Sequence, residues 1–128
     1  MQYKSDDITK DKIEIFLEVN LLYDFYGKLL TKRQSEFIEL YYNHDLSLGE
    51  IAEQYSISRQ GVYDIVKRAE KILKKYEEKL GLVKKFQTQK FKLQEIYDML
   101  TTLGSSALNE DDLNLEIEKI KKLVKELI

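Results

Sequence analysis

The stretch SLGEIAEQYSISRQGVYDIVKR, residues 47–68, has a spacing of small and apolar residues that decides the fold of this part of the chain. A helix-turn-helix needs a small residue in its first helix, because its two helices cross closely over a tight turn. It also needs a turn residue four positions later, and apolar residues ten and thirteen positions later on the second helix. These positions hold Ala52, Ser56, Val62 and Ile65. The stretch therefore predicts a helix-turn-helix motif.

Capping residues divide the sequence around this motif. A capping box is a hydroxyl residue followed three positions later by Glu or Gln, which together satisfy two backbone amides at a helix start. The two matching pairs are Thr31 with Gln34 and Ser47 with Glu50. They predict one helix that runs to about Asn43 and a short one that ends near Tyr55. Ser58 has the hydroxyl of an N-cap, and Gly81 suits the left-handed end of the helix that follows.

Apolar residues three and four positions apart predict helices on both sides of the motif. Before it, a helix capped by Asp11 would bury Ile13, Phe16, Leu17, Leu21, Leu22, Phe25 and Leu29. After Gly81 the apolar pattern restarts out of phase, and a last helix is predicted from about Glu110 to Ile128. We expect an all-α protein with a flexible N-terminus (1–10), a helix-turn-helix domain (11–81) and a C-terminal helical hairpin that dimerises (82–128).

The composition favours long helices and excludes several kinds of site. The 128 residues are 43% hydrophobic and 34% charged, with no proline and 5 glycines, so the backbone is seldom forced to turn. Cysteine is absent, which excludes disulfides, thiolate metal sites and a cysteine nucleophile. His44, the single histidine, lies in a predicted loop, and no glycine-rich phosphate loop occurs. We therefore expect no enzyme activity, no cofactor and no metal.

The sequence offers no candidate for a membrane span. No apolar run approaches the roughly 18 residues that a span requires. The first residues, MQYKSDDITK, include acids where a signal peptide would carry a basic region before an apolar one. We expect a cytoplasmic protein.

Charge is distributed unevenly along the chain. Residues 1–57 carry a net charge of −5, residues 58–92 of +7 and residues 93–128 of −4, which together give the net charge of −2. A basic middle segment would attract a phosphate backbone. It would equally allow helices of the same protein to pair by charge, and both interpretations remain open.

The residues able to reach a nucleic acid lie at the start of the helix after Ser58. The candidates are Ser58, Arg59, Gln60, Tyr63, Lys67, Arg68 and Lys71, and the motif core beneath them is Ile51, Ala52, Ile57, Val62 and Ile65. Arg59 and Gln60 have the donors that suit guanine and adenine edges. Asp64 has the wrong charge for a phosphate, unless it accepts from a cytosine amine or pairs with Lys67 or Arg68 on its own helix. A solvated polar face is the alternative for each residue taken singly.

Residues 21–82, LLYDFYGKLLTKRQSEFIELYYNHDLSLGEIAEQYSISRQGVYDIVKRAEKILKKYEEKLGL, closely resemble the YlxM family of small helix-turn-helix proteins of Gram-positive bacteria and mycoplasmas. The resemblance depends on the blocks DFYGKLLT, LYYNHDLSLGEIAE and SRQGVYD, which occur in order. A more distant likeness is to the promoter-reading fourth region of sigma factors. Gly61 departs from the family, in which alanine is usual at this position.

The resemblance implies an all-helical protein that forms a homodimer and is linked to the signal recognition particle, through its protein or its RNA. On this basis we expect a regulatory helix-turn-helix protein of that pathway with weak DNA binding. The alternative is a dimeric transcriptional regulator that reads a specific DNA sequence. No DNA target follows from the resemblance.

Overall fold

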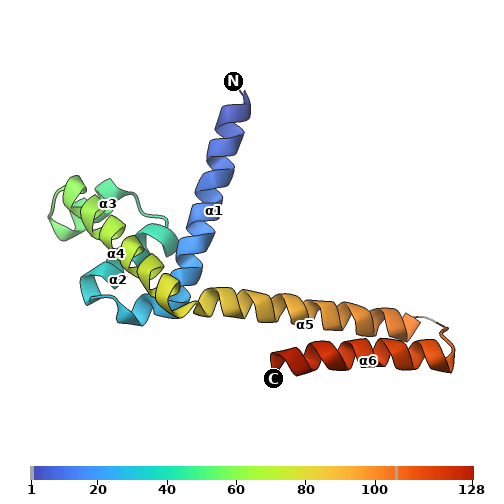
Figure 1. Cartoon of the computed structure of the whole chain (residues 1–128). Helices are drawn as coiled ribbons and strands as arrows, with labels where there is room; N and C mark the ends of the chain where they lie inside the picture. Colours follow the sequence, from blue (N-terminus) through green and yellow to red (C-terminus); the bar gives the residue numbers. More distant parts are fainter. Residues whose placement is uncertain (1, 106) are drawn as a thin grey trace. The chain divides into compact units, whose positions relative to one another are not determined.

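The described part of the chain is helical, in agreement with the predicted all-α class. A computed structural model describes the backbone of residues 2–105 and 107–128, and their side chains from residue 11 onward. No strand occurs in these ranges. In order, the elements are α1 (Gln2–Tyr26), η1 (Gly27–Leu29), α2 (Lys32–Ile38), η2 (Glu39–Asn43), α3 (Leu48–Tyr55), α4 (Arg59–Leu80), α5 (Leu82–Ser105) and α6 (Glu110–Leu127), labelled in Figure 1 where there is room. They form two compact units, residues 1–83 and residues 84–128.

The first helix begins earlier than the sequence predicts. α1 starts at Gln2 and includes residues 2–10, so the N-cap predicted at Asp11 is wrong. Residues 2–26 contain neither glycine nor proline, and nothing in this backbone interrupts a helix before Asp11. α1 ends at Tyr26, where the short 3₁₀ segment η1 leads the chain to α2.

One buried core joins the helices of the first unit. Its main members are Val19, Leu22 and Tyr26 of α1, Phe37 and Ile38 of α2, Ile51 and Ala52 of α3, and Val62, Val66, Ala69 and Leu73 of α4. The α4 members follow one another at intervals of four, three and four residues, so they form a single stripe. α4 therefore faces the core along one side of its first four turns.

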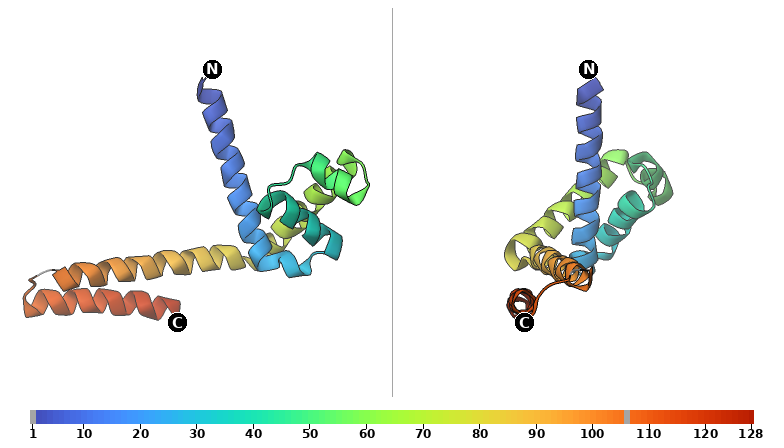
Figure 2. Two further views of the ribbon diagram at one scale, coloured as in Figure 1. Left: turned by 180° about the vertical axis from the view of Figure 1, so that it is seen from behind. Right: turned by 90° about the vertical axis from the view of Figure 1, so that its right-hand side faces the viewer.

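The buried face of α1 differs from the predicted one. Ile13 and Leu17 are 55% and 64% exposed, whereas Val19 and Tyr26, which the predicted face omitted, are almost fully buried. Apolar residues surround much of this helix, so their spacing alone does not show which side meets the core. In Figure 2 the start of α1 extends past the other helices of its unit, which therefore do not cover it.

The other predicted caps are present and divide the first unit into its helices. Both capping boxes form, at Thr31 with Gln34 and at Ser47 with Glu50. The Ser58 hydroxyl accepts from the Gly61 amide at 2.9 Å and so caps α4. Gly81 ends α4 with a φ of 62°, in the left-handed region that glycine adopts without strain.

Residues 39–43 form a π-helical segment, which the sequence did not predict. The helix expected to continue to Asn43 keeps its α form only to Ile38, and η2 follows it. The wider turn places two consecutive tyrosine rings near Phe16, with centroid separations of 5.8 Å for Tyr41 and 4.7 Å for Tyr42. η2 therefore packs against α1 through these rings.

A polar junction connects α1, the end of α4 and the first residues of α5. The Tyr26 hydroxyl donates to Glu77 Oε1 at 2.6 Å and accepts from the Leu82 amide at 3.1 Å. Glu77 Oε1 also accepts from the Val83 amide at 3.0 Å. The first amides of a helix have no partner within the helix. Side chains of α1 and α4 therefore supply the acceptors for the start of α5.

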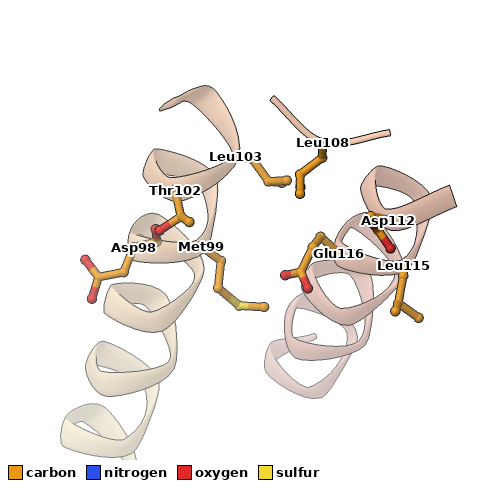
Figure 3. Close-up of a pocket in the computed structure, with 8 residues that line it drawn as sticks. All are labelled: Asp98, Met99, Thr102, Leu103, Leu108, Asp112, Leu115 and Glu116. Atoms are coloured by element: carbon orange, nitrogen blue, oxygen red, sulfur yellow. The ribbon is translucent and has the colours of Figure 1, made fainter. Parts of the chain in front are cut away.

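The second unit is a hairpin of α5 and α6, which run side by side in opposite directions (Figure 1). Lys92 Nζ lies 3.3 Å from Glu126 Oε2 across the pair, and Ile96 is the most buried apolar residue of α5 in this unit. Near the connecting loop the two helices leave a cavity of about 440 Å³. Figure 3 shows Met99 and Leu103 of α5 and Leu108 of the loop pointing into the space between the helices.

Candidate nucleic-acid interface

The core of the motif holds the start of α4 firmly against α3. Ile51, Ala52 and Val62 are buried, while Ile57 and Ile65 are half-buried at the edges of the contact. Ser56, in the turn between the helices, has a φ of 55°, which is the left-handed conformation that the position demands. The opposite side of α4 faces solvent.

All seven residues predicted to reach a nucleic acid are exposed. They are Ser58, Arg59, Gln60, Tyr63, Lys67, Arg68 and Lys71, on or just before the first turns of α4. Ser58 uses its hydroxyl as the helix cap, so its structural role is already defined. The others present guanidinium, amide, phenol and ammonium groups to solvent. We refer to the six residues of α4 as the exposed row.

Asp64 pairs with a neighbour other than those considered from the sequence. Gln60 Nε2 donates to Asp64 Oδ1 at 2.9 Å, one helical turn apart. Lys67, one of the two basic residues proposed as its partner, instead lies with its Nζ 3.3 Å from Glu70 Oε2. The carboxylate of Asp64 is therefore bound to an amide that belongs to the exposed row.

Lys67 is held by its own helix but keeps donors for a ligand. Its Nζ lies 5.6 Å from the centroid of the Tyr63 ring, besides contacting Glu70. A lysine ammonium has three donors, and the Lys67 side chain is 52% exposed. It can therefore contact a phosphate while it remains attached to Glu70.

The start of α4 borders an open hollow. Its volume is about 490 Å³, and Arg59, Gln60 and Tyr63 line it together with Leu48, the first residue of α3. Both helices of the motif thus direct their N-terminal ends to one concave surface. Polar groups of a ligand lying there would meet the donors of Arg59 and Gln60.

A buried carboxylate lies behind the exposed row, and the sequence does not predict it. Glu70 is only 6% exposed, and the Tyr42 hydroxyl donates a hydrogen bond to it. Burial, followed by the hydrogen bond and the charge of Glu70, raises the pKa of Tyr42 above its usual range. The only local signal is that Glu70 lies beside Ala69 within the apolar stripe of α4, and the spacing does not identify Tyr42 as its partner.

The described residues show no arrangement suited to a metal. In residues 11–105 and 107–128, no three histidine, aspartate or glutamate side chains converge on one point. The His44 side chain is 60% exposed, on the surface just after η2. Its Nε2 lies 4.0 Å from Glu39 Oε1. Within the same residues, no helix combines the length and the apolar character needed to cross a bilayer.

Comparison with known proteins connects this motif to a family. A family model described as "Putative helix-turn-helix protein, YlxM / p13 like" matches residues 13–124. A protein of Desulforamulus reducens is 50% identical over 113 residues, which cover 88% of this chain and 92% of that protein. YlxM of Bacillus subtilis is 47% identical over 111 residues, 87% of this chain and 97% of its own length. A protein of Caldanaerobacter subterraneus is 59% identical over 85 residues, 66% of this chain and 73% of that protein.

The matched region contains α3, the turn, α4 and the exposed row, and it continues through most of the hairpin. The buried motif residues and the left-handed turn agree with the helix-turn-helix that the family description names. The chain therefore belongs to the YlxM / p13 like family of helix-turn-helix proteins.

Proposed function

We propose that this protein is a regulatory protein that binds nucleic acid with the exposed row of α4. The observation that carries the proposal is the two-sided character of this helix, whose buried side is core and whose other side presents Arg59, Gln60 and Lys71 together. The second helix of a helix-turn-helix places its first residues against base edges in the major groove. In that position Arg59 would contact guanine and Gln60 adenine.

Basic residues on the same side would hold the phosphate backbone. Lys67, Arg68 and Lys71 follow the base-reading positions, and residues 58–92 carry a net charge of +7. The flanking segments are acidic and would repel a duplex that reached them. We therefore expect weak binding that depends steeply on salt.

A titration of a fluorescent random-sequence duplex, followed by polarisation at several salt concentrations, tests this proposal. The logarithm of the affinity should fall linearly with the logarithm of the salt concentration, with a slope of about −0.9 for each phosphate contact. Lys71→Gln should reduce the slope by about 0.9. Lys28→Gln, an exposed lysine of η1, is the control and should leave the slope unchanged. Salt-independent binding, or equal effects of both substitutions, would refute the proposal.

A homodimer belongs to the same proposal, and the hairpin has the surface for it. α5 and α6 pack against each other along a seam of less exposed apolar residues. This seam contains Ile96, Met99 and Leu103 of α5 and Ile120, Leu123 and Leu127 of α6. Each helix carries a second apolar stripe, rotated in the same sense from this seam. These residues, which we call the hairpin face, are Phe86, Leu93, Tyr97 and Leu100 of α5 and Leu113, Ile117 and Val124 of α6, all 37% to 66% exposed.

The two stripes lie on one side of the hairpin. In an antiparallel helix pair, positions rotated in the same sense from the seam of each helix flank the same side. The hairpin face is therefore continuous, and a second copy would cover it by forming a four-helix bundle around a two-fold axis. The free energy of association would come from burial of these seven side chains.

If the protein is a sequence-specific transcriptional regulator, its two α4 helices must reach successive major grooves. They would then lie about 34 Å apart in the dimer. The chain has no cysteine, so a single Arg59→Cys substitution allows site-specific spin labelling and a distance measurement between subunits. A separation far from one helical repeat of DNA would exclude this alternative.

A second candidate is regulation of the signal recognition particle through its protein or RNA. The observation that favours it is the basic side of α4 beyond the exposed row, where Lys74, Lys75 and Lys79 are also exposed. The last of these residues, Lys79, lies twenty positions after Arg59, which is about 30 Å along the helix. These lysines are therefore beyond the part of a recognition helix that enters a groove. Binding of the purified particle, measured with and without its RNA, tests this candidate. Absence of binding at micromolar concentration would refute it.

A further inference from the structure

The hydrogen bond between Gln60 and Asp64 accounts for an acidic residue in the middle of a surface that is otherwise suited to nucleic acid. Gln60 Nε2 donates to Asp64 Oδ1 at 2.9 Å, and both residues are exposed. An ionised carboxylate only accepts hydrogen bonds, whereas a glutamine amide has two donors and one acceptor. The amide nitrogen of Gln60 must therefore be the atom that faces Asp64, and this contact orients the amide.

The groups that remain available on Gln60 match one base. With one N–H bound to Asp64, the amide keeps a second N–H and its carbonyl oxygen. Adenine presents an acceptor, N7, beside a donor, the N6 amine, in the major groove. A free glutamine side chain loses rotamer freedom when it is fixed on a base. A glutamine that is already held by a neighbour loses less.

We propose that Asp64 is a positioning residue that orients the Gln60 amide to read adenine in duplex DNA. The inference rests on the proposed nucleic-acid binding of α4. If Asp64 accepts from the N–H trans to the Gln60 carbonyl, the other N–H and the carbonyl oxygen lie on one edge of the amide and can face the base together. Lys67 is engaged by Glu70 and does not draw Asp64 away from this role.

Asp64 then has opposite effects on affinity and on specificity. Its negative charge repels the phosphates of any duplex, so it weakens binding irrespective of sequence. Its contact with Gln60 strengthens binding only where adenine occupies the matching position. An asparagine at position 64 would remove the charge but keep an oxygen acceptor for Gln60, whereas an alanine would remove both.

The experiment uses the full chain and a duplex obtained by selection from a random library at low salt. Each base of the selected duplex is substituted in turn, and the affinities are measured for the unmodified protein and for Gln60→Ala, Asp64→Ala, Asp64→Asn and the Gln60→Ala/Asp64→Ala pair. Glu78→Ala is the control for net charge, because Glu78 is an exposed acid of α4 that lies fourteen residues after Asp64. Circular dichroism confirms that each variant is folded.

We expect the unmodified protein, Asp64→Asn and Glu78→Ala to prefer adenine at one position by about tenfold. Gln60→Ala and Asp64→Ala should both lose this preference, and the double substitution should lose no more than either alone. Asp64→Ala and Asp64→Asn should both bind random duplex more tightly than the unmodified protein.

Retention of the adenine preference in Asp64→Ala, or its loss in Asp64→Asn, would overturn the inference. Salt-dependent binding without any base preference would also overturn it, while leaving the proposed function intact. A complete absence of duplex binding would overturn both.

Discussion

Tyr26 and Glu77 are joined by a hydrogen bond of 2.6 Å between residues 51 positions apart in the sequence. Each side chain also accepts a hydrogen bond from a backbone amide at the start of α5. Tyr26 accepts from Leu82, and Glu77 accepts from Val83. The hydroxyl of a single tyrosine thus connects α1, α4 and the segment that leaves α4. Removing it would leave a carboxylate and an amide without this partner.

Tyr26→Phe should lower the free energy of unfolding by about 1–3 kcal/mol, because polar groups in the junction lose their partner. Tyr63→Phe is the matched control, since the Tyr63 ring is exposed, and it should change the value by less than about 0.5 kcal/mol. Urea denaturation of both variants measures the difference. If Tyr26→Phe lowered the free energy of unfolding no more than Tyr63→Phe, the junction would contribute no stability.

The stability of the first unit should fall at high pH. Burial, and then the contact with Glu70, raise the pKa of Tyr42. Above about pH 10 the unfolded chain therefore loses a proton from this tyrosine while the folded chain keeps it, so unfolding becomes more favourable as pH rises. The stabilising contribution is complete below that pH. It disappears as the pH rises toward the pKa of the folded state.

Tyr42→Phe isolates this contribution. Unfolding measured in urea between about pH 8 and pH 11 should give a shallower decline for the variant than for the unmodified protein. Some decline will remain, because burial also raises the pKa of Tyr26 and of Tyr55. Parallel pH curves would contradict the assignment of the slope to Tyr42.

Ser56→Gly should stabilise the protein. A serine with a φ of 55° bears the steric strain of the left-handed region, whereas glycine adopts this region freely. We expect the free energy of unfolding to rise by about 0.5–1 kcal/mol. Gly81→Ala, at a φ of 62°, is the reciprocal test and should lower it by about 1 kcal/mol. A loss of stability in Ser56→Gly would show that its side chain makes a stabilising contact.

Leu93→Glu should dissociate the proposed dimer. Leu93 lies on the hairpin face and is 58% exposed in the single chain, so a charge there would be buried between subunits. Phe91→Glu is the control, because Phe91 is 67% exposed and lies on a different side of α5. Analytical ultracentrifugation should show a dimer for the unmodified protein and for Phe91→Glu, and a monomer for Leu93→Glu. A monomeric unmodified protein would refute the dimer itself.

Features that depend on local chemistry were predictable from the sequence. Thr31 with Gln34 and Ser47 with Glu50 form capping boxes because each hydroxyl residue lies three positions before an amide or carboxylate side chain at a helix start. Gly81 ends α4 because glycine adopts the left-handed φ without strain. The spacing from Ala52 to Ile65 reflects the close crossing of two helices. All of these signals lie within a few residues of the structure that they specify.

Features that depend on distant partners were not predictable. The buried side of α1 is determined by its contacts with α2, η2 and α4. The spacing of apolar residues alone therefore predicts that Ile13 is buried and does not identify Val19. From the sequence alone, Glu70 is expected to be a solvated charge. In the structure the π-helical segment brings Tyr42 into hydrogen-bonding contact with it. The charge of Asp64 favours a basic partner such as Lys67 or Arg68 after it in the helix, whereas its partner in the structure is Gln60, one turn before it. In each case the deciding contact is one among several that the sequence allows.

The two sides of α4 assign the core and the proposed nucleic-acid contacts to separate sets of residues. The core residues of α4 are Val62, Val66, Ala69 and Leu73. The exposed row lies on the other side of the helix and contributes little to the core. Substitutions in the row should therefore alter the proposed nucleic-acid binding without lowering the stability of the domain. Such a helix allows one scaffold to acquire new targets by a few surface changes, or to lose nucleic-acid binding altogether and remain a folded protein.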